Sequence, residues 1–385
     1  MASFNTTSPA IMSDSSLFLS SAATLRGASS ASFLPALLGF DGFIDTICDA
    51  VDTRASAASY ERVKTLRAFG ERIAAAAGKS TNVEIVPTLV KLGGNGPIMA
   101  NALTSLGTPV TYCGMTGYPN THPVFLEFGE RARLLPICEP ALTDAYEFDD
   151  GKLIVGKHAT VAEVTHENII ARIGEVAWRA AWESASFVAM VNWTMLPYMT
   201  ALWQQIQADF PASDARKTLF FDLADPEKRS ADDISQALEV IAAFQTQHDV
   251  ILGLNEKEAI HIGQVLHIET PVGGVLTPET ATELAAAIRA RLEIGVVVVH
   301  PTRFAAAASA SDSACVEGPW TPNPKISTGA GDHFNAGFCF GQLLGADLAQ
   351  SLQIGVGTSG FYVRNAQSPS RDDLAGFLES LASAA

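Results

Sequence analysis

The sequence has few positive charges, no long apolar run and no histidine or cysteine spacing typical of a metal site. Its 385 residues contain 25 Lys and Arg against 41 Asp and Glu, which gives a formal net charge of −16. Nucleic acids and anionic membranes are bound through basic surfaces, so this composition argues against both as partners. No stretch approaches 18 uninterrupted apolar residues, and we therefore expect no membrane-spanning helix.

The five cysteines are odd in number and scattered, unlike the framework of a disulfide-stabilised extracellular domain. Most of them lie inside apolar runs and are expected to be reduced thiols: Cys48, Cys113, Cys138, Cys315 and Cys339. The eight histidines show no metal-ligand spacing, which argues against a metalloenzyme.

Residues 1–34 are rich in Ser and Ala and have no basic side chain before Arg26. They lack the basic start and the sustained apolar run of a signal peptide. We therefore expect a cytoplasmic protein with an N-terminal arm over residues 1–34 that is loosely ordered or an addition to the fold, followed by one domain over residues 35–385.

From residue 35 onward, strand patterns alternate with helix patterns, which favours one large α/β unit. Apolar strands are expected at 35–40, 110–115, 187–192, 218–223, 250–254 and 296–299. Amphipathic or apolar helices are expected at 61–77, 123–134, 231–244 and 256–266. Right-handed crossovers would place helices on both faces of the sheet, so the sequence predicts a doubly wound α/β/α sandwich.

A hairpin signal interrupts this alternation. Asp150-Gly151 lies between alternating apolar residues of 146–155, which predicts a tight turn joining two antiparallel strands. Together with an extended segment near Thr46–Val51, the hairpin should form a small accessory sheet, with strands within about 43–53 and 136–165.

One glycine loop near the C-terminus indicates an anion site. Gly329-Ala330-Gly331-Asp332 precedes a strongly apolar segment, so we read it as a tight loop that opens a buried helix. The unpaired backbone N–H groups of Gly329, Ala330 and Gly331 should face a phosphate there. Asp332 could then be a general base for an attacking hydroxyl, or it could simply cap its helix.

A second helix start has the same character. Gly93, Gly94 and Gly96 precede or open a predicted helix and would let a ligand approach the backbone, while Asn95 offers a polar side chain. Two acids, Asp41 and Asp45, follow the first strand, where open α/β sheets bind their ligands. They could alternatively be turn formers beside a glycine.

These motifs carry a family resemblance. Thr328-Gly329-Ala330-Gly331-Asp332 resembles the C-terminal signature of the ribokinase (PfkB) family of carbohydrate and nucleoside kinases, and 91–103 resembles the N-terminal one. The resemblance covers roughly residues 35–380. It implies a ribokinase-like fold whose β-sheet lid closes over the sugar and often mediates dimerisation. It also implies that the Gly-Ala-Gly backbone forms the anion hole and that Asp332 is the catalytic base.

The resemblance implies further roles for individual side chains. Asp45, more than Asp41, would bind substrate hydroxyls together with Gly94 and Asn95. Asn255 and Glu258 match an Asn-x-x-Glu motif whose acid holds the Mg²⁺ of the nucleotide, although an Asn cap with a first-turn Glu is the structural alternative.

The nucleotide site is expected to involve Asn255, Thr328 and Arg303, whose charge could contact phosphate. Three positions depart from the family pattern. Ile326 replaces an Asp that helps to form a monovalent-cation site in some members, Ile98 replaces an Asn, and 300–303 reads His-Pro-Thr-Arg where many members have a Thr-x-Gly nucleotide segment. The sequence therefore does not decide whether potassium activates the protein or which residues form the nucleotide pocket.

We expect a sugar kinase that transfers the γ-phosphoryl group of Mg·ATP to a hydroxyl of a small sugar or polyol, with a homodimer through the lid as one arrangement. One alternative is an ADP-dependent sugar kinase, because 93–101 and 253–256 also resemble that group. Another is a non-catalytic sugar- or nucleotide-binding regulator on the same scaffold, against which the retained Asp332 and Glu258 argue. A dinucleotide-dependent oxidoreductase is disfavoured, since no Gly-x-Gly-x-x-Gly follows the first strand.

Overall fold

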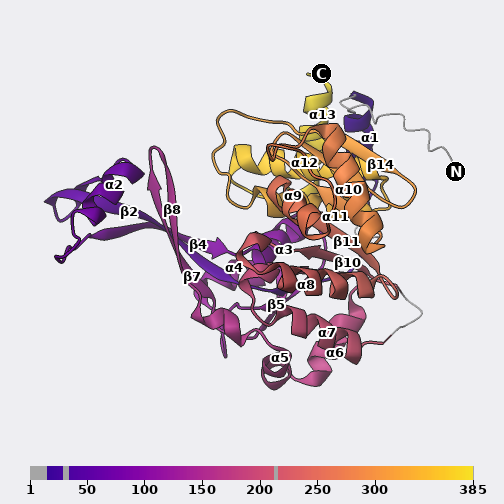
Figure 1. Ribbon diagram of the computed structural model, residues 1–385, viewed down its shortest axis with the longest axis horizontal. Coiled ribbons are helices and arrows are strands. Elements are labelled where there is room, and N and C mark those ends of the chain that lie inside the picture. The colour runs from indigo at the N-terminus through magenta and orange to yellow at the C-terminus, as the bar shows by residue number, and fades with distance from the viewer. Residues whose placement is uncertain (1–14, 29–33, 212–215, 385) are drawn as a thin grey trace.

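The computed structural model describes residues 15–28, 34–211 and 216–384. A nine-stranded sheet with the order β14-β13-β12-β11-β10-β9-β1-β5-β6 forms its centre (Figure 1). The strands are β1 (Ala36–Phe40), β5 (Val110–Gly114), β6 (Ala132–Pro136), β9 (Phe187–Val191), β10 (Thr218–Asp222), β11 (Asp249–Leu254), β12 (Val296–Val299), β13 (Phe304–Ala308) and β14 (Ser313–Glu317). All neighbours pair in parallel except β12–β13 and β13–β14, which are antiparallel.

Helices cover both faces of this sheet, and each face has its own hydrophobic core. One face packs against α5 (His166–Ile173), α6 (Glu175–Ser184), α7 (Met199–Asp209), α8 (Ala231–Phe244), α9 (Glu256–Val265) and α10 (Pro278–Leu292). The other packs against α1 (Ser15–Gly27), α3 (Asn95–Ser105), α4 (Leu126–Gly129), α11 (Ala330–Leu343), α12 (Leu348–Asn365) and α13 (Arg371–Ala382). Successive strand residues such as Phe220 and Phe221 enter opposite cores, since side chains alternate across a sheet. The predicted α/β/α sandwich is confirmed.

The described part of the expected N-terminal arm is the packed helix α1. It lies beside α13 (Figure 1), and Leu17, Phe18 and Leu25 are buried in the core of that face. The Arg26 guanidinium donates to both carboxylate oxygens of Glu379 at 2.7 and 2.8 Å. Residues 15–27 are thus part of the sandwich, while residues 1–14 and 29–33 lie outside the described residues.

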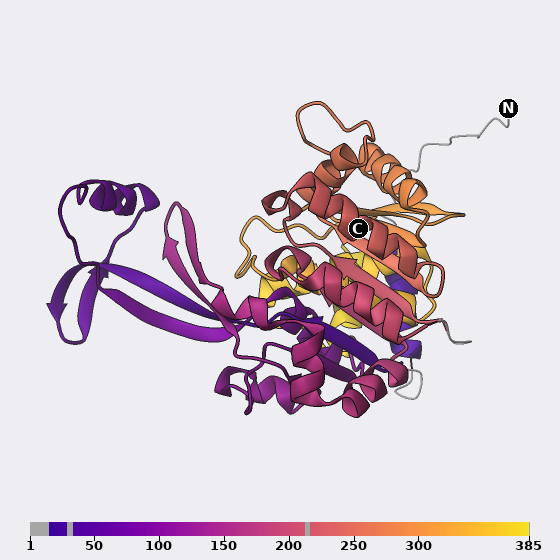
Figure 2. The same cartoon turned by 60° about the horizontal axis from the view of Figure 1, so that its bottom comes forward.

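A second sheet projects from the sandwich and is the expected lid (Figure 2). It contains β2 (Phe43–Ser56), β3 (Ser59–Arg62), β4 (Ile85–Gly93), β7 (Ala141–Phe148) and β8 (Gly151–Lys157), with α2 (Leu66–Ala74) at its outer end. The inner half of β2 pairs with β4 and β7, and its outer half pairs with β3. The hairpin predicted at Asp150-Gly151 is confirmed as the turn between β7 and β8.

Two helix predictions were too long. The segment expected to be helical over 61–77 begins with the end of β3, and its helix is only α2. The helix expected over 123–134 is wrong in its second half, because residues 132–136 form β6 beside β5. Ala132 and Leu135 contact different cores on opposite faces of the sheet, as side chains of a strand do. So short a segment shows no periodicity that could distinguish a strand from a helix.

The site lies where the chain direction across the sheet reverses. β1 runs between β5 and β9, so successive crossovers leave the centre of the sheet in opposite directions. Polar side chains follow the carboxyl ends of these central strands: Asp41 after β1, Asn192 after β9, Asp222 at the end of β10 and Asn255 after β11. Such a switch point is where open α/β sheets bind ligands. Among the described residues, no helix is long and apolar enough to cross a membrane.

Candidate active site

Asp332 lies in the first turn of α11 and is only 8% exposed. Its Oδ1 accepts a hydrogen bond of 2.9 Å from Nδ2 of Asn95, at the start of α3. Burial, opposed by the Asn95 bond and aided by the charges of Asp41 and Glu258, raises the pKa of Asp332 to about 8. A carboxyl group that titrates near neutral pH is suited to take a proton from a hydroxyl.

The loop before Asp332 presents free backbone amides. Gly329 has φ +89° and ψ 2°, in the left-handed region, and a Cβ there would lie 3.2 Å from Oη of Tyr362. Within the described part of the chain, the N–H groups of Gly329 and Gly331 have no acceptor, whereas the N–H of Ala330 donates to the carbonyl of Ser327 at 3.1 Å. The expectation of three unpaired amides is therefore wrong for Ala330, because the helix begins with a tight turn that uses this donor.

Asp41 is fully buried and is satisfied from inside the protein. Its carboxylate accepts from the backbone N–H groups of Asn95 and Gly96, both at 2.9 Å, and from Nδ2 of Asn192 at 2.7 Å. Burial raises the pKa of Asp41 to about 6. A Cβ on Gly96 would lie 2.5 Å from the Asp41 carboxylate, so only glycine allows this approach. Asp41 thus holds the start of α3, from which Asn95 reaches Asp332.

Asp45 lies on β2 and faces a cavity of about 840 Å³ between the lid and the sandwich. This cavity is also lined by Gly94, Asn95, Thr328 and Glu258. Burial raises the pKa of Asp45, while the positive charges of two lid lysines, Lys91 and Lys152, oppose that shift. The structure therefore brings five of the predicted site residues to one cavity.

Glu258 and Asn255 form a reciprocal cap at the start of α9. The Asn255 side chain accepts from the N–H of Glu258 at 3.0 Å, and Glu258 accepts from the N–H of Asn255 at 2.8 Å. The other carboxylate oxygen of Glu258 accepts from the N–H of Asp225, also at 2.8 Å. The helix cap that the sequence offered as the structural alternative is thus present. The same bonds fix the buried Glu258 carboxylate at the wall of the cavity.

Comparison with known proteins identifies the family. The family model described as prokaryotic ketohexokinase matches residues 31–381. A ketohexokinase of Haloferax volcanii is 30% identical over 345 residues, which are 89% of this chain and 90% of that protein. The chain belongs to the prokaryotic ketohexokinase family. The resemblance to the PfkB carbohydrate kinases is confirmed, and the protein is a sugar kinase, a phosphotransferase with an alcohol group as acceptor.

Solved structures of ribokinase-like enzymes have the same fold. A nucleoside kinase of Methanocaldococcus jannaschii has a TM-score of 0.58 and 13% identity, with 90% of this chain and 99% of that one covered. The ribokinase of Thermotoga maritima has a TM-score of 0.57 and 15% identity, with coverage of 90% and 99%. Arabidopsis thaliana ribokinase, solved with ribose and ATP, has a TM-score of 0.59 and 14% identity, with coverage of 90% and 98%.

Sequence reasoning missed some of the polar residues that this ketohexokinase-family chain gathers around Asp332. Asn192 lines the cavity and bonds Asp41, yet it is an isolated Asn after an apolar strand and gave no motif. Asp222, the last residue of β10, is buried and accepts from Nδ2 of Asn335 at 2.7 Å. Burial, together with the charges of Glu258 and Asp332, raises the pKa of Asp222 well above its usual value.

Asp222 belongs to a buried cluster of three carboxyl groups. Asp222, Glu258 and Asp332 are at most 8% exposed, and the charges of Glu258 and Asp332 disfavour ionisation of Asp222. Among the described residues, no group of three or more His, Cys, Asp or Glu side chains is placed to hold a metal ion by itself. Mg²⁺ needs only one or two carboxylates besides water and phosphate oxygens, so the carboxylates present suit it.

A second cavity, of about 440 Å³, lies against the same glycine loop. Its lining includes Gly331, His300, Phe334 and Trp320. The His300 ring packs against Phe334 with centroids 4.6 Å apart and planes tilted by 31°. Burial lowers the pKa of His300 to about 4. Its Nε2 has no hydrogen-bond partner among the described residues. Arg303, predicted to contact phosphate, does not line this cavity; its guanidinium lies over the Trp320 ring, 4.2 Å from the centroid.

Proposed function

We propose that this protein is an ATP-dependent ketohexokinase that phosphorylates a hydroxyl of a ketohexose. The observation that carries the proposal is the hydrogen bond between Asn95 and Asp332. Asn95 lines the cavity between lid and sandwich, and Asp332 is a buried carboxyl group next to the loop whose Gly329 and Gly331 amides are free, so the bond connects the two sites. The family and the H. volcanii relative, a ketohexokinase, support the class of acceptor.

The sugar would occupy the cavity between lid and sandwich. Asp45 would accept hydrogen bonds from its hydroxyls, and Asn95 and Asn192 offer amide groups on the same wall. Gly94 has φ +97° at the cap of α3, and a Cβ there would lie 2.9 Å from Asp41 and 3.1 Å from Phe43. We assign Asp41 to holding this wall rather than to contacting the sugar, since its oxygens are already bonded inside the protein.

Asp332 would take the proton of the hydroxyl that attacks the γ-phosphorus of ATP, and the bond from phosphorus to the ADP oxygen would break. The amides of Gly329 and Gly331 would hold the transferring group, as backbone N–H groups at a helix start do for phosphate. Mg²⁺, held by Glu258 and Asn255 through water, would supply positive charge to the phosphates. The cavity lined by His300 and Trp320 adjoins Gly331 and would receive the nucleotide, with Thr328 at the opposite cavity.

Phosphoryl transfer by the purified protein tests the proposal. Mg·ATP and Mg·ADP would be offered in parallel with ketohexoses, aldohexoses, sugar phosphates and nucleosides, and product formation followed by a coupled assay. We expect turnover with ATP and a ketohexose. Turnover restricted to ADP, or to another acceptor class, would contradict the proposed donor or acceptor, and ligand-induced thermal stabilisation without turnover would favour a regulator.

We also propose that the protein is a cytoplasmic homodimer that pairs through its lid. The lid strands carry large apolar side chains that are 41 to 60% exposed: Leu89, Val90, Leu142, Ile154 and Val155. Apolar surface gathered on one element is typical of an interface. The five cysteines are unpaired and buried, which supports a reducing compartment. Sedimentation of the wild type and of Val155→Lys tests the dimer, since a lid interface predicts a monomeric variant and Val155 does not line the sugar cavity.

A further inference from the structure

Two side chains behind the glycine loop hold its carbonyl groups. Oη of Tyr362, on α12, donates to the carbonyl of Thr328 at 2.9 Å. Nδ1 of His333, on α11, lies 2.7 Å from the carbonyl of Gly329. The two rings are stacked, with centroids 3.6 Å apart and planes 13° from parallel. Neither residue belongs to the loop motif or contacts the sugar cavity.

The chemistry of its neighbours fixes the form of His333. A carbonyl oxygen can only accept, so Nδ1 carries the proton and donates to Gly329. Burial lowers the pKa of His333 to about 4, so the ring is neutral near physiological pH and Nε2 is an acceptor. The hydroxyl of Ser368, 2.9 Å away, therefore donates to Nε2.

Each of these two bonds anchors a peptide plane that contains a loop amide. The carbonyl of Thr328 and the N–H of Gly329 belong to one planar peptide unit and point in opposite directions. Because Tyr362 holds the carbonyl on one side, the free N–H of Gly329 is fixed on the other. His333 anchors the next peptide unit, whose carbonyl also accepts the first backbone bond of α11, from the N–H of His333 at 3.1 Å.

Gly329 has the greatest need of such anchoring in the loop. Its left-handed φ of +89° requires glycine, and glycine has more backbone freedom than any other residue. The ring pair lies against it so closely that a Cβ would be 3.2 Å from Oη of Tyr362. The pair thus fixes both peptide planes that flank the most flexible residue of the loop.

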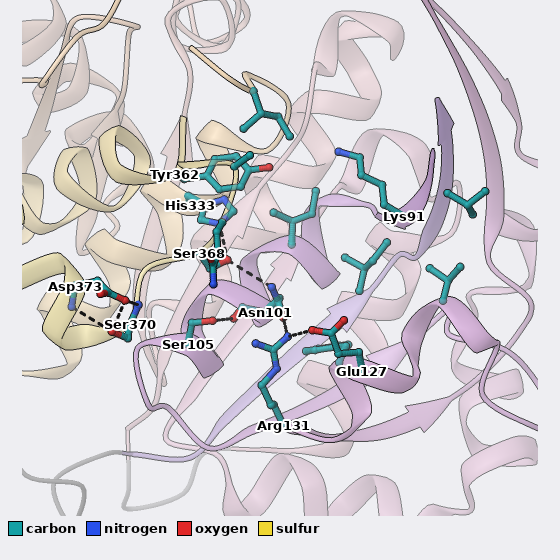
Figure 3. Close-up of a pocket in the computed structure, with 18 residues that line it drawn as sticks. Lys91, Asn101, Ser105, Glu127, Arg131, His333, Tyr362, Ser368, Ser370 and Asp373 are labelled. Carbon is teal, nitrogen blue, oxygen red and sulfur yellow. Dashed lines mark hydrogen bonds and ion pairs between the residues drawn. The ribbon is translucent and has the colours of Figure 1, made fainter. Parts of the chain in front are cut away.

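The pair also separates the loop from a third cavity. Figure 3 shows Tyr362 above His333 on one wall of this cavity of about 700 Å³, with Ser368 beneath the histidine. From Ser368 the contacts continue to Asn101 and on to Arg131, with bonds of 3.4 and 2.8 Å. The rings are therefore braced from behind by α3 and by the segment after α12.

We propose that His333 and Tyr362 are positioning residues for phosphoryl transfer, which orient the Gly329 amide toward the transferring group without contacting either substrate. The proposal rests on the proposed kinase function and adds to it two residues outside the family motif. It predicts that losing either bond slows the transfer step and leaves ground-state binding of the acceptor and of ADP unchanged.

The test removes one bond at a time. Tyr362→Phe keeps the ring stack and deletes only the hydroxyl, and His333→Phe keeps a stacked ring and deletes both nitrogens. His333→Asn retains an amide N–H that can reach the Gly329 carbonyl. Ser380→Ala is the matched control, because it deletes a hydroxyl-to-carbonyl bond of the same kind, to Phe377 on α13.

For each protein, kcat and the acceptor KM would be measured, together with the affinity for Mg·ADP with and without aluminium fluoride, which mimics the transferring phosphoryl group. We expect Tyr362→Phe and His333→Phe each to lower kcat and the aluminium fluoride affinity by roughly 2- to 10-fold, the value of one hydrogen bond. The acceptor KM and the Mg·ADP affinity should stay within about twofold, and His333→Asn should recover part of the loss. The double variant should lose less than the product of the single losses, because the stacked rings act together.

The proposal would be overturned if Tyr362→Phe and His333→Phe kept the kcat and the aluminium fluoride affinity of the wild type. It would also be overturned if the affinity for Mg·ADP alone fell as much as the affinity for Mg·ADP with aluminium fluoride. A lower melting temperature with unchanged kinetics would also contradict the proposal, because it would show that His333 and Tyr362 only stabilise the fold. If the wild type itself turns over no sugar, the proposed function fails, and the aluminium fluoride comparison then decides on the pair independently.

Discussion

Replacing Asp332 with Asn removes the proposed base while keeping the size of the side chain. The carboxamide oxygen of the variant would still accept from Nδ2 of Asn95, so the wall of the sugar cavity should be unchanged. The lost step is proton transfer from the acceptor hydroxyl, which a positioned base accelerates by about 10²- to 10⁴-fold. We therefore expect kcat to fall by that factor, with Mg·ATP affinity preserved because the Gly329 and Gly331 amides remain.

The same substitution should stabilise the protein at high pH. The unfolded chain releases the Asp332 proton near pH 3.8, whereas the folded chain releases it near pH 8. The folded state therefore keeps the proton between these values, and its stability falls as the pH rises from about 4 to 8. A shift of this size corresponds to on the order of 5 kcal/mol against the ionised form, a cost that asparagine does not carry.

Three measurements check this reasoning. Coupled turnover gives kcat, calorimetry gives Mg·ATP affinity, and thermal unfolding at pH 6 and pH 8.5 gives the change in stability. Asp372→Asn, at an 80% exposed side chain on α13, controls for charge removal as such. A kcat within tenfold of the wild type would refute the general-base role, and a melting temperature at pH 8.5 no higher than that of the wild type would refute the burial argument.

Further variants test the residues around Asp332. Glu258→Gln should raise the Mg²⁺ requirement and destabilise α9 by about 1–3 kcal/mol, because its carboxylate accepts two backbone N–H groups; unchanged Mg²⁺ dependence in an activity titration would leave only the capping role. Asp41→Asn should lower the pKa of Asp332 by removing a nearby negative charge, so the acid limb of kcat/KM should move to lower pH, and an unmoved limb would contradict the coupling. Gly329→Ala should cost about 1–2 kcal/mol of stability for its left-handed backbone and reduce kcat; wild-type melting temperature and turnover would show that the loop tolerates a side chain.

Much of the fold followed from local patterns. The apolar strands around 187–191 and 250–254 are buried on both faces, as parallel strands between helices must be, and their runs of Val, Ile, Leu and Phe indicate this directly. The hairpin at Asp150-Gly151 was equally clear from turn chemistry. The segment 132–136 was not, because a segment of five residues is too short to show a periodicity that separates strand from helix.

The site was foreseen only in part, for a physical reason. A glycine loop followed by an acid, and an Asn cap with a Glu three residues later, are formed by consecutive residues and could be read as Gly329–Asp332 and Asn255–Glu258. The sequence could not show that Asn95 donates a hydrogen bond to Asp332 or that the Asp41 carboxylate is bonded to backbone N–H groups at the start of α3. Nor could it show that the N–H of Ala330 donates to the carbonyl of Ser327. The sequence by itself determined the α/β sandwich, the hairpin lid and the two glycine-rich helix starts, because backbone geometry and helix capping depend on near neighbours. Only the tertiary structure decided which of two acids faces the sugar cavity and which rings brace the loop, because contacts between residues up to hundreds of positions apart depend on how the strands and helices pack.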